Sequence, residues 1–259
     1  MDVPPVKASP RRDGDAIAIP GDYQHRALLE GSSIQRYWHQ SKLELLDWLF
    51  TPEPTDVVVD VGCGSGVFAN QLASYGADVL AIDGNAEAVA YASETFGRNR
   101  LEFRQGLLDE LDLPESSFDR ATCLEIVEHV YPDQVHALFA QLRRILRPGG
   151  SLLVTTPNYR GVWPLVEWAS DRFARTAKMD ADQHVTHFSR SMLRSFLTDA
   201  GFEIQTLRTY CTFSPFVSAL SWPAARRLDL IERRIDWPFG NLLAAVARNP
   251  LGNPARGPR

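Results

Sequence analysis

Residues 57–66 read VVVDVGCGSG and are the most informative ten residues of the chain. Three consecutive valines favour a buried strand, and Gly62, Gly64 and Gly66 then alternate with small residues. Glycine lets a chain turn sharply and lets another group approach the backbone closely. The stretch therefore predicts a strand, a tight loop and the start of a helix, with the loop available for a ligand.

The spacing of these glycines argues against a pyrophosphate as that ligand. Dinucleotide-binding loops read G-x-G-x-x-G, whereas here the third glycine comes one residue earlier and Asp60 would repel a phosphate. Asp83 follows seventeen residues after Gly66, at the end of a second predicted strand, where a carboxylate can accept hydrogen bonds from both hydroxyls of a ribose. The alternative is that tight strand–helix turns need glycine anyway and that strand ends often carry Asp.

The rest of the chain alternates strands with helices. This rhythm predicts an α/β fold: a Rossmann-like, doubly wound, mostly parallel sheet with helices on both faces. We expect seven strands, the last of them antiparallel, and a turn at Pro148-Gly149-Gly150. The strands are expected at 56–62, 78–83, 101–106, 118–125, 151–157, 202–210 and 241–248, and the helices at 32–50, 67–76, 85–96, 133–146 and 190–201.

The composition and the two ends of the chain indicate the domain organisation, the class of ligand and the cellular location. Residues 1–22 are expected to form a flexible arm, 23–248 one domain with aromatic helical cap inserts at 158–189 and 211–240, and 249–259 a flexible tail. The net charge is −5 and there is no long basic run, so we expect no nucleic-acid groove. Three scattered cysteines, no signal peptide and no run of about 20 apolar residues predict a cytoplasmic protein.

Four motifs arrive in the order and spacing of a known family. D-V-G-C-G-S-G, A-I-D-G, S-S-F-D and L-R-P-G-G-S-L-L-V-T-T-P-N resemble the class I S-adenosylmethionine-dependent methyltransferases over about residues 33–248. The resemblance implies that the glycine loop faces the methionine part of the cofactor and that Asp83 holds the ribose. The family often has an acid at the Leu107 position, so backbone groups near Leu108 and Asp109 would hold the adenine here. The implied cofactor-binding residues are Lys42, Asp60, Gly62, Gly64, Gly66, Asp83, Gly84, Leu107, Leu108 and Leu124.

The stretch C-L-E-I-V-E-H-V (123–130) resembles the ubiquinone-pathway O-methyltransferases more narrowly. That resemblance implies a cofactor contact from Leu124 and places Lys42 where the family has an arginine for the methionine carboxylate. If a helix begins at residue 125, Glu125, Glu128 and His129 face one point and could hold Mg²⁺ or Mn²⁺. The alternative needs no metal: these residues shape the pocket, and His129 is the general base.

The two inserts are predicted to form the acceptor side of the site. Residues 158–189 are aromatic and contain His184 and His187, either of which could orient an acceptor hydroxyl or complete a metal shell. His129, Glu128 and His187 are therefore the candidate catalytic residues. Within 212–240, the run RRLDLIERRI can be a basic amphipathic helix that meets a membrane, or a cap helix whose Arg and Glu side chains pair on its wet face. We favour the cap.

The two inserts predict a hydrophobic or aromatic small molecule as acceptor. The resemblance to the ubiquinone-pathway enzymes implies O-methylation, with S-adenosylmethionine as methyl donor. N- or C-methylation remains open. An NAD-dependent oxidoreductase or epimerase is the rival enzyme class, but the glycine spacing and the absence of a Y-x-x-x-K pair oppose it. A non-catalytic cofactor-binding protein is a third reading, opposed by the intact glycines and Asp83.

Overall fold

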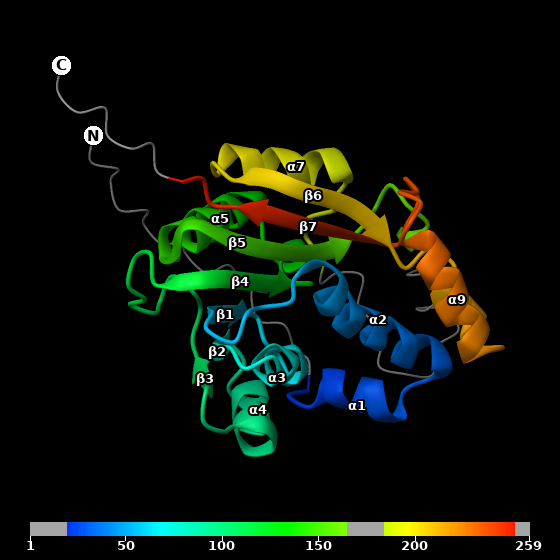
Figure 1. Cartoon of the computed structure of the whole chain (residues 1–259), viewed down its shortest axis with the longest axis horizontal. Helices are drawn as coiled ribbons and strands as arrows, with labels where there is room; N and C mark the ends of the chain where they lie inside the picture. Colours follow the sequence, from blue (N-terminus) through cyan, green and yellow to red (C-terminus); the bar gives the residue numbers. More distant parts are fainter. Residues whose placement is uncertain (1–19, 165–183, 252–259) are drawn as a thin grey trace.

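The structure is a computed structural model that describes residues 20–164 and 184–251. At its centre lies one seven-stranded sheet of order β3-β2-β1-β4-β5-β7-β6 (Figure 1). The strands are β1 Val57–Val61, β2 Asp78–Asp83, β3 Leu101–Gln105, β4 Phe118–Leu124, β5 Leu146–Pro157, β6 Glu203–Tyr210 and β7 Leu242–Arg248. β1 to β5 pair in parallel, and β7 runs antiparallel to β5 and β6. The predicted fold class is therefore confirmed.

Helices cover both faces of this sheet (Figure 1). They are α1 Tyr23–Glu30, α2 Ser33–Leu49, α3 Val67–Ser74, α4 Ala86–Phe96, α5 Pro132–Ile145, α7 Arg190–Asp199, α8 Ser214–Val217 and α9 Trp222–Glu232, with a 3₁₀ turn η1 at Val127–His129. One apolar cluster joins α2 and α3 to one face of the sheet, and a second joins α5 and α7 to the other. No helix within the described residues has the length and apolar run needed to cross a bilayer.

The two clusters follow from the alternation of side chains along each strand. Val58 belongs to the cluster under α2 and α3, while its neighbours Val59 and Val61 belong to the cluster under α5 and α7. Successive residues of a strand point to opposite faces, so a central strand with apolar residues on both sides needs helices on both sides. The valine run that opens the glycine motif is buried for this reason.

Two local features differ from the sequence-based expectation. The predicted turn at residues 148–150 instead forms an irregularity within β5: Phe118 pairs with Leu146, but Arg120 already pairs with Ser151. The short helices α1 and α8 were not predicted, because eight and four residues are too few to show a helical period. Most of the expected arm, residues 165–183 of the first insert and most of the expected tail lie outside the described residues.

Candidate active site

The site is built at the carboxyl ends of the strands, beginning with the glycine loop between β1 and α3. Gly62, Gly64 and Gly66 have φ angles of +75°, +49° and +80°, which side chains rarely permit. A Cβ atom on Gly62 would meet the side chain of Ile126, and one on Gly66 would lie 2.8 Å from the Phe103 ring. The glycines therefore serve the loop's own conformation and packing, and the same bare backbone leaves amides close to any ligand above it.

Asp60, at the end of β1, is a buried acid with one free oxygen. Its side chain is 2 % exposed, and its Oδ1 accepts a hydrogen bond of 2.6 Å from the Thr122 hydroxyl. Oδ2 has no hydrogen-bond partner among the described residues. Burial, reinforced by the nearby Asp83 carboxylate and opposed by Thr122, raises the pKa of Asp60 to about 7. An unpaired buried carboxyl oxygen is costly, so this position suits a cationic donor supplied by a ligand.

Asp83, the last residue of β2, fixes the glycine loop from the side. Its Oδ2 accepts from the backbone amide of Gly64 at 2.8 Å, and its Oδ1 accepts from the amide of Asn85 at 2.8 Å. A carboxylate has about four acceptor positions, so both oxygens retain capacity for two ribose hydroxyls. The structure thus brings both acids to the glycine loop: Asp60 precedes it on β1, and Asp83 bonds the amide of Gly64 within it.

The helix α1 lies directly over the glycine loop, which the sequence did not indicate. Gln24 Oε1 accepts from both the amide and the hydroxyl of Ser65, at 2.8 and 3.1 Å. The amide of His25 donates to the Ser65 hydroxyl at 3.1 Å, and the His25 ring bonds Tyr91 at 2.7 Å. The Gln24 carboxamide occupies the space that a Cβ on Gly64 would need. α1 is therefore attached to the loop and to α4 by side-chain hydrogen bonds.

The residues expected around the adenine lie after β3. Leu108 is buried, whereas Leu107 is 40 % exposed and covers Gly84, where an added Cβ would come within 2.9 Å of the Leu107 side chain. Leu124 ends β4 and is buried at 7 % exposure. An apolar surface for a planar base is thus present beside Asp83.

Lys42 and Glu125 form an ion pair beneath the acceptor side of the site. Lys42 Nζ lies 3.2 Å from Glu125 Oε2, and the other Glu125 oxygen accepts from the Thr155 hydroxyl at 2.7 Å. The ammonium also lies 5.7 Å from the centre of the Trp38 ring. Lys42 is almost fully buried, so its charge is compensated by Glu125.

The local helix assumed for residues 125–129 does not form. Glu125 has a left-handed φ of +57°, and only the 3₁₀ turn η1 covers Val127–His129. Non-glycine residues in this region store strain, which occurs most often at functional sites. Glu125 pairs with Lys42, and His129 lies beside Glu128 of the same turn and His184 from a later segment.

Glu128, His129 and His184 converge at this point. Glu128 is 1 % exposed and accepts from the Thr156 hydroxyl at 2.9 Å; burial and then the Glu125 charge raise the pKa of its carboxyl. His129 Nε2 lies 4.0 Å from Glu128 Oε1, and the His129 and His184 ring centres are 4.8 Å apart. Burial, with the neighbouring histidines and Lys42, lowers the pKa of His184 to about 3. That imidazole is neutral.

One potential ligand atom from each of Glu128, His129 and His184 lies within 4.8 Å of the others, the only such group of three among the described residues. Ligands around a bound ion at about 2.1 Å lie roughly 3–4 Å apart, so this set would have to contract slightly. One carboxylate and two imidazoles suit Mn²⁺ better than Mg²⁺. Glu125, the third member of the expected metal set, is engaged with Lys42 instead.

Aromatic rings line the region around His129 and His184. Trp38 and Trp163 pack at 5.1 Å between ring centres, and the Trp163 indole N–H is buried without a partner among the described residues. The Tyr159 hydroxyl and His184 Nδ1 are 2.6 Å apart. His187 is exposed, stacks on Tyr159 at 4.0 Å and contacts the His184 carbonyl at 3.1 Å. His184 is therefore closer to His129 than the predicted His187, which supports it from outside.

Sequence reasoning did not single out Trp38 or Gln24. A signal for Trp38 was present, because it precedes Lys42 by one helical turn and so shares its face of α2. Gln24 had none, since its importance depends on how α1 docks onto the loop.

Residues 59–154 match the family described as "Methyltransferase domain". A probable S-adenosylmethionine-dependent methyltransferase of Mycobacterium tuberculosis is 31 % identical over 169 residues, which cover 65 % of this chain and 57 % of that protein. A ubiquinone biosynthesis O-methyltransferase of Alkalilimnicola ehrlichii is 39 % identical over 104 residues, 39 % of this chain and 41 % of the relative. The chain thus spans about half the length of these curated relatives.

Solved structures agree on the fold. A methyltransferase of Thermotoga maritima, described as a possible histamine N-methyltransferase, superposes with a TM-score of 0.64 over 88 % of this chain and 95 % of its own. Its identity is 19 %, so the likeness concerns the architecture and not the substrate.

Proposed function

We propose that the chain carries a class I S-adenosylmethionine-dependent methyltransferase domain and that this domain methylates a hydroxyl group of a hydrophobic or aromatic small molecule. The observation that carries the proposal is the position of His129: its imidazole lies beside the buried Glu128 carboxyl and the neutral His184 ring. The tryptophan pair of Trp38 and Trp163 forms an apolar wall on the same side.

The loop and its two acids fit the cofactor. When bound, S-adenosylmethionine supplies an electrophilic methyl group on a positively charged sulfur. Asp83 would hold the ribose hydroxyls, and the unpaired Oδ2 of Asp60 would accept from the methionine ammonium. Leu107 and Leu108 would lie against the adenine. The Asp60 oxygen is unpaired, Asp83 retains acceptor capacity, and Leu107 is exposed.

The acceptor side supplies a base and a place for a ring. A phenol with a pKa near 10 is a weak nucleophile at neutral pH, so its proton has to be removed as the methyl group is transferred. In the proposal the His129 imidazole takes that proton, His184 orients the hydroxyl, and Trp38 and Trp163 pack against the ring. Positioning then supplies most of the remaining acceleration.

A divalent metal is the second form of this proposal. Glu128, His129 and His184 would hold it, and a cation at that position lowers the pKa of a bound hydroxyl. EDTA separates the two forms: activity that survives EDTA unchanged supports His129 as the base, whereas loss restored by Mn²⁺ supports the metal.

The test begins with calorimetry of the full chain against S-adenosylmethionine and NAD. Heat with the former alone supports the proposal, and no heat with it refutes the methyltransferase. A panel of phenols, catechols and prenylated phenols follows, with product mass and the site of methylation as readouts.

His129→Ala should reduce turnover about 10²–10⁴-fold, the range for a general base. His136→Asn, at an exposed histidine on α5, is the matched control. A product methylated on nitrogen or carbon would replace O-methylation with those alternatives, and cofactor binding without turnover on any acceptor would favour the non-catalytic reading.

A further inference from the structure

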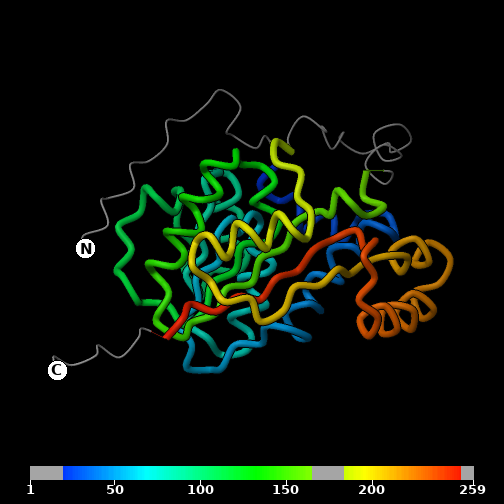
Figure 2. Tube along the Cα trace, turned by 90° about the horizontal axis from the view of Figure 1, so that it is seen from above, coloured from blue at the N-terminus to red at the C-terminus, as the bar shows by residue number. Residues whose placement is uncertain are grey.

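The segment between β6 and β7 carries most of the exposed apolar surface of the described chain. Twelve large hydrophobic side chains are exposed among the described residues, and eight of them fall within the 27 residues 213–239. This segment, which holds α8 and α9, projects from one end of the molecule (Figure 2). The eight residues, called the cap face from here on, are Phe213, Phe216, Leu220, Leu230, Ile231, Ile235, Trp237 and Phe239.

The helix α9 differs from an ordinary surface helix in which side chains it buries. Its buried residues are Ala225, Asp229 and Glu232, so both of its acids lie on the packing face. At the spacing of a helix, Arg227, Leu230 and Ile231 lie on the opposite face, and all three are exposed. The expectation that Arg and Glu pair on the wet face is therefore wrong: the acids face inward.

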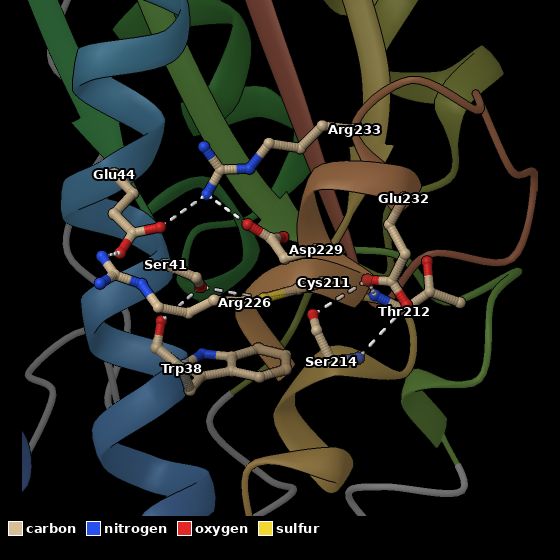
Figure 3. Close-up of polar contacts among 10 residues, drawn as sticks. All are labelled: Trp38, Ser41, Glu44, Cys211, Thr212, Ser214, Arg226, Asp229, Glu232 and Arg233. Atoms are coloured by element: carbon tan, nitrogen blue, oxygen red, sulfur yellow. Dashed lines mark hydrogen bonds and ion pairs between the residues drawn. The ribbon is translucent and has the colours of Figure 1, made fainter. Parts of the chain in front are cut away.

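Both inward acids have local partners, as Figure 3 shows. Glu232 accepts hydrogen bonds from the amides of Thr212, Phe213 and Ser214 and from the Ser214 hydroxyl, at 2.7–3.2 Å. Asp229 pairs with Arg233 at 2.5 Å.

Glu44 of α2 completes this arrangement from the neighbouring helix. It pairs with Arg226 at 2.7 Å and with Arg233 at 3.0 Å (Figure 3). Arg227 and the exposed Arg234, in the turn that follows α9, have no acidic partner within the described residues. The only exposed acid of the segment, Asp236, is paired with Arg190. The outer side of α9 is therefore cationic and apolar at once.

We propose that the cap face is a docking surface for an anionic membrane. Exposed aliphatic and aromatic side chains interleaved with unpaired arginines match the boundary between lipid headgroups and acyl chains. The charge is specific to this surface, because the chain as a whole carries −5. A second copy of the chain is less suitable, because face-to-face pairing would bring Arg227 and Arg234 against cations without an acid to receive them. The inference needs only this surface and is independent of the proposed activity.

The experiment is flotation of the full chain with vesicles of phosphatidylcholine alone or with added phosphatidylglycerol. The wild type should float with the anionic vesicles and remain largely in solution with the neutral ones. Arg227→Gln with Arg234→Gln should lower the partition coefficient about thirty-fold, since each arginine near an anionic surface contributes a factor of about five. Leu230→Ser should lower it as well.

Matched controls test whether the location matters. Leu29, on α1, is 60 % exposed, as Leu230 is, so Leu29→Ser should leave partitioning unchanged. Arg194→Gln, at an exposed arginine on α7, is the charge control. Circular dichroism and melting temperature check that each variant folds. Three results overturn the proposal: no flotation of the wild type with anionic vesicles, equal flotation of the double arginine variant, or a stable dimer in sedimentation velocity that loses its self-association with Leu230→Ser and binds no vesicle.

Discussion

Asp60 gives the sharpest quantitative prediction. Its pKa is about 7 in the folded protein against 3.8 in its ordinary state. A group whose pKa rises on folding favours the folded state fully below the unfolded pKa and loses that contribution as the pH rises through the folded pKa. The difference corresponds to about 4 kcal/mol in total, at 1.36 kcal/mol for each pKa unit. Asp60 should therefore destabilise the free protein progressively between about pH 4 and pH 7.

The perturbation is Asp60→Asn, which keeps the shape and leaves an oxygen to accept from Thr122. Other buried groups also titrate: Glu128 acts with the same sign as Asp60, and His184 with the opposite sign. These contributions cancel in the difference between variant and wild type. From pH 5 to pH 7 the wild type should lose about 2 kcal/mol of unfolding free energy relative to Asp60→Asn, because the slope of 1.36 kcal/mol per pH unit flattens as the pH reaches the folded pKa.

Urea unfolding at pH 5, 6, 7 and 8, followed by circular dichroism, measures that difference. A difference that stays constant from pH 5 to pH 7 would mean that Asp60 is already ionised in the folded state, and the reasoning from burial would fail. Binding supplies a second readout. A cationic ligand at Oδ2 favours the carboxylate, so affinity for S-adenosylmethionine should rise from pH 5.5 to 7 in the wild type, while Asp60→Asn binds weakly at every pH.

Four further substitutions address the loop and the buried ion pair. Asp83→Ala should weaken cofactor binding by about 1–3 kcal/mol in calorimetry, and unchanged affinity would remove it from the ribose site. Gln24→Ala removes both bonds to Ser65, so cofactor affinity should fall about 5–10-fold and α1 should become more sensitive to limited proteolysis. Lys42→Met should cost about 1–3 kcal/mol of stability by leaving Glu125 unpaired. The same change combined with Glu125→Gln should cost less than the sum, and strict additivity would show that the pair is not coupled.

The sheet was predictable because its signals are local and repeated. The valine run of β1, the alternating glycines and the aspartate that ends β2 each act through neighbours in sequence or through the adjacent strand. A buried parallel strand requires apolar residues on both faces, and a tight loop with positive φ requires glycine. These requirements leave a recognisable pattern in the sequence. That pattern predicted the loop and the aspartate on the cofactor side of the site.

The arrangement of side chains on the acceptor side was not predictable in the same way, because it depends on contacts between segments far apart in the chain. Glu125, expected beside Glu128 and His129, is drawn to Lys42 by charge, and His184 lies beside His129 in its place. Gln24 reaches the glycine loop from a helix too short to show a period.

The inward position of the acids of α9 also results from contacts between distant segments. Sequence shows Arg and Glu side chains on one amphipathic helix, but only the backbone amides of 212–214 and Glu44 of α2 decide that its acids point inward. Sequence alone therefore determined the sheet and the loop, because propensity and backbone strain are local, and its motifs indicated the cofactor class through their resemblance to a known family. The tertiary structure decided which polar groups lie beside His129 and which face of α9 is exposed to solvent, because a buried charge pairs with a group that is close to it in space.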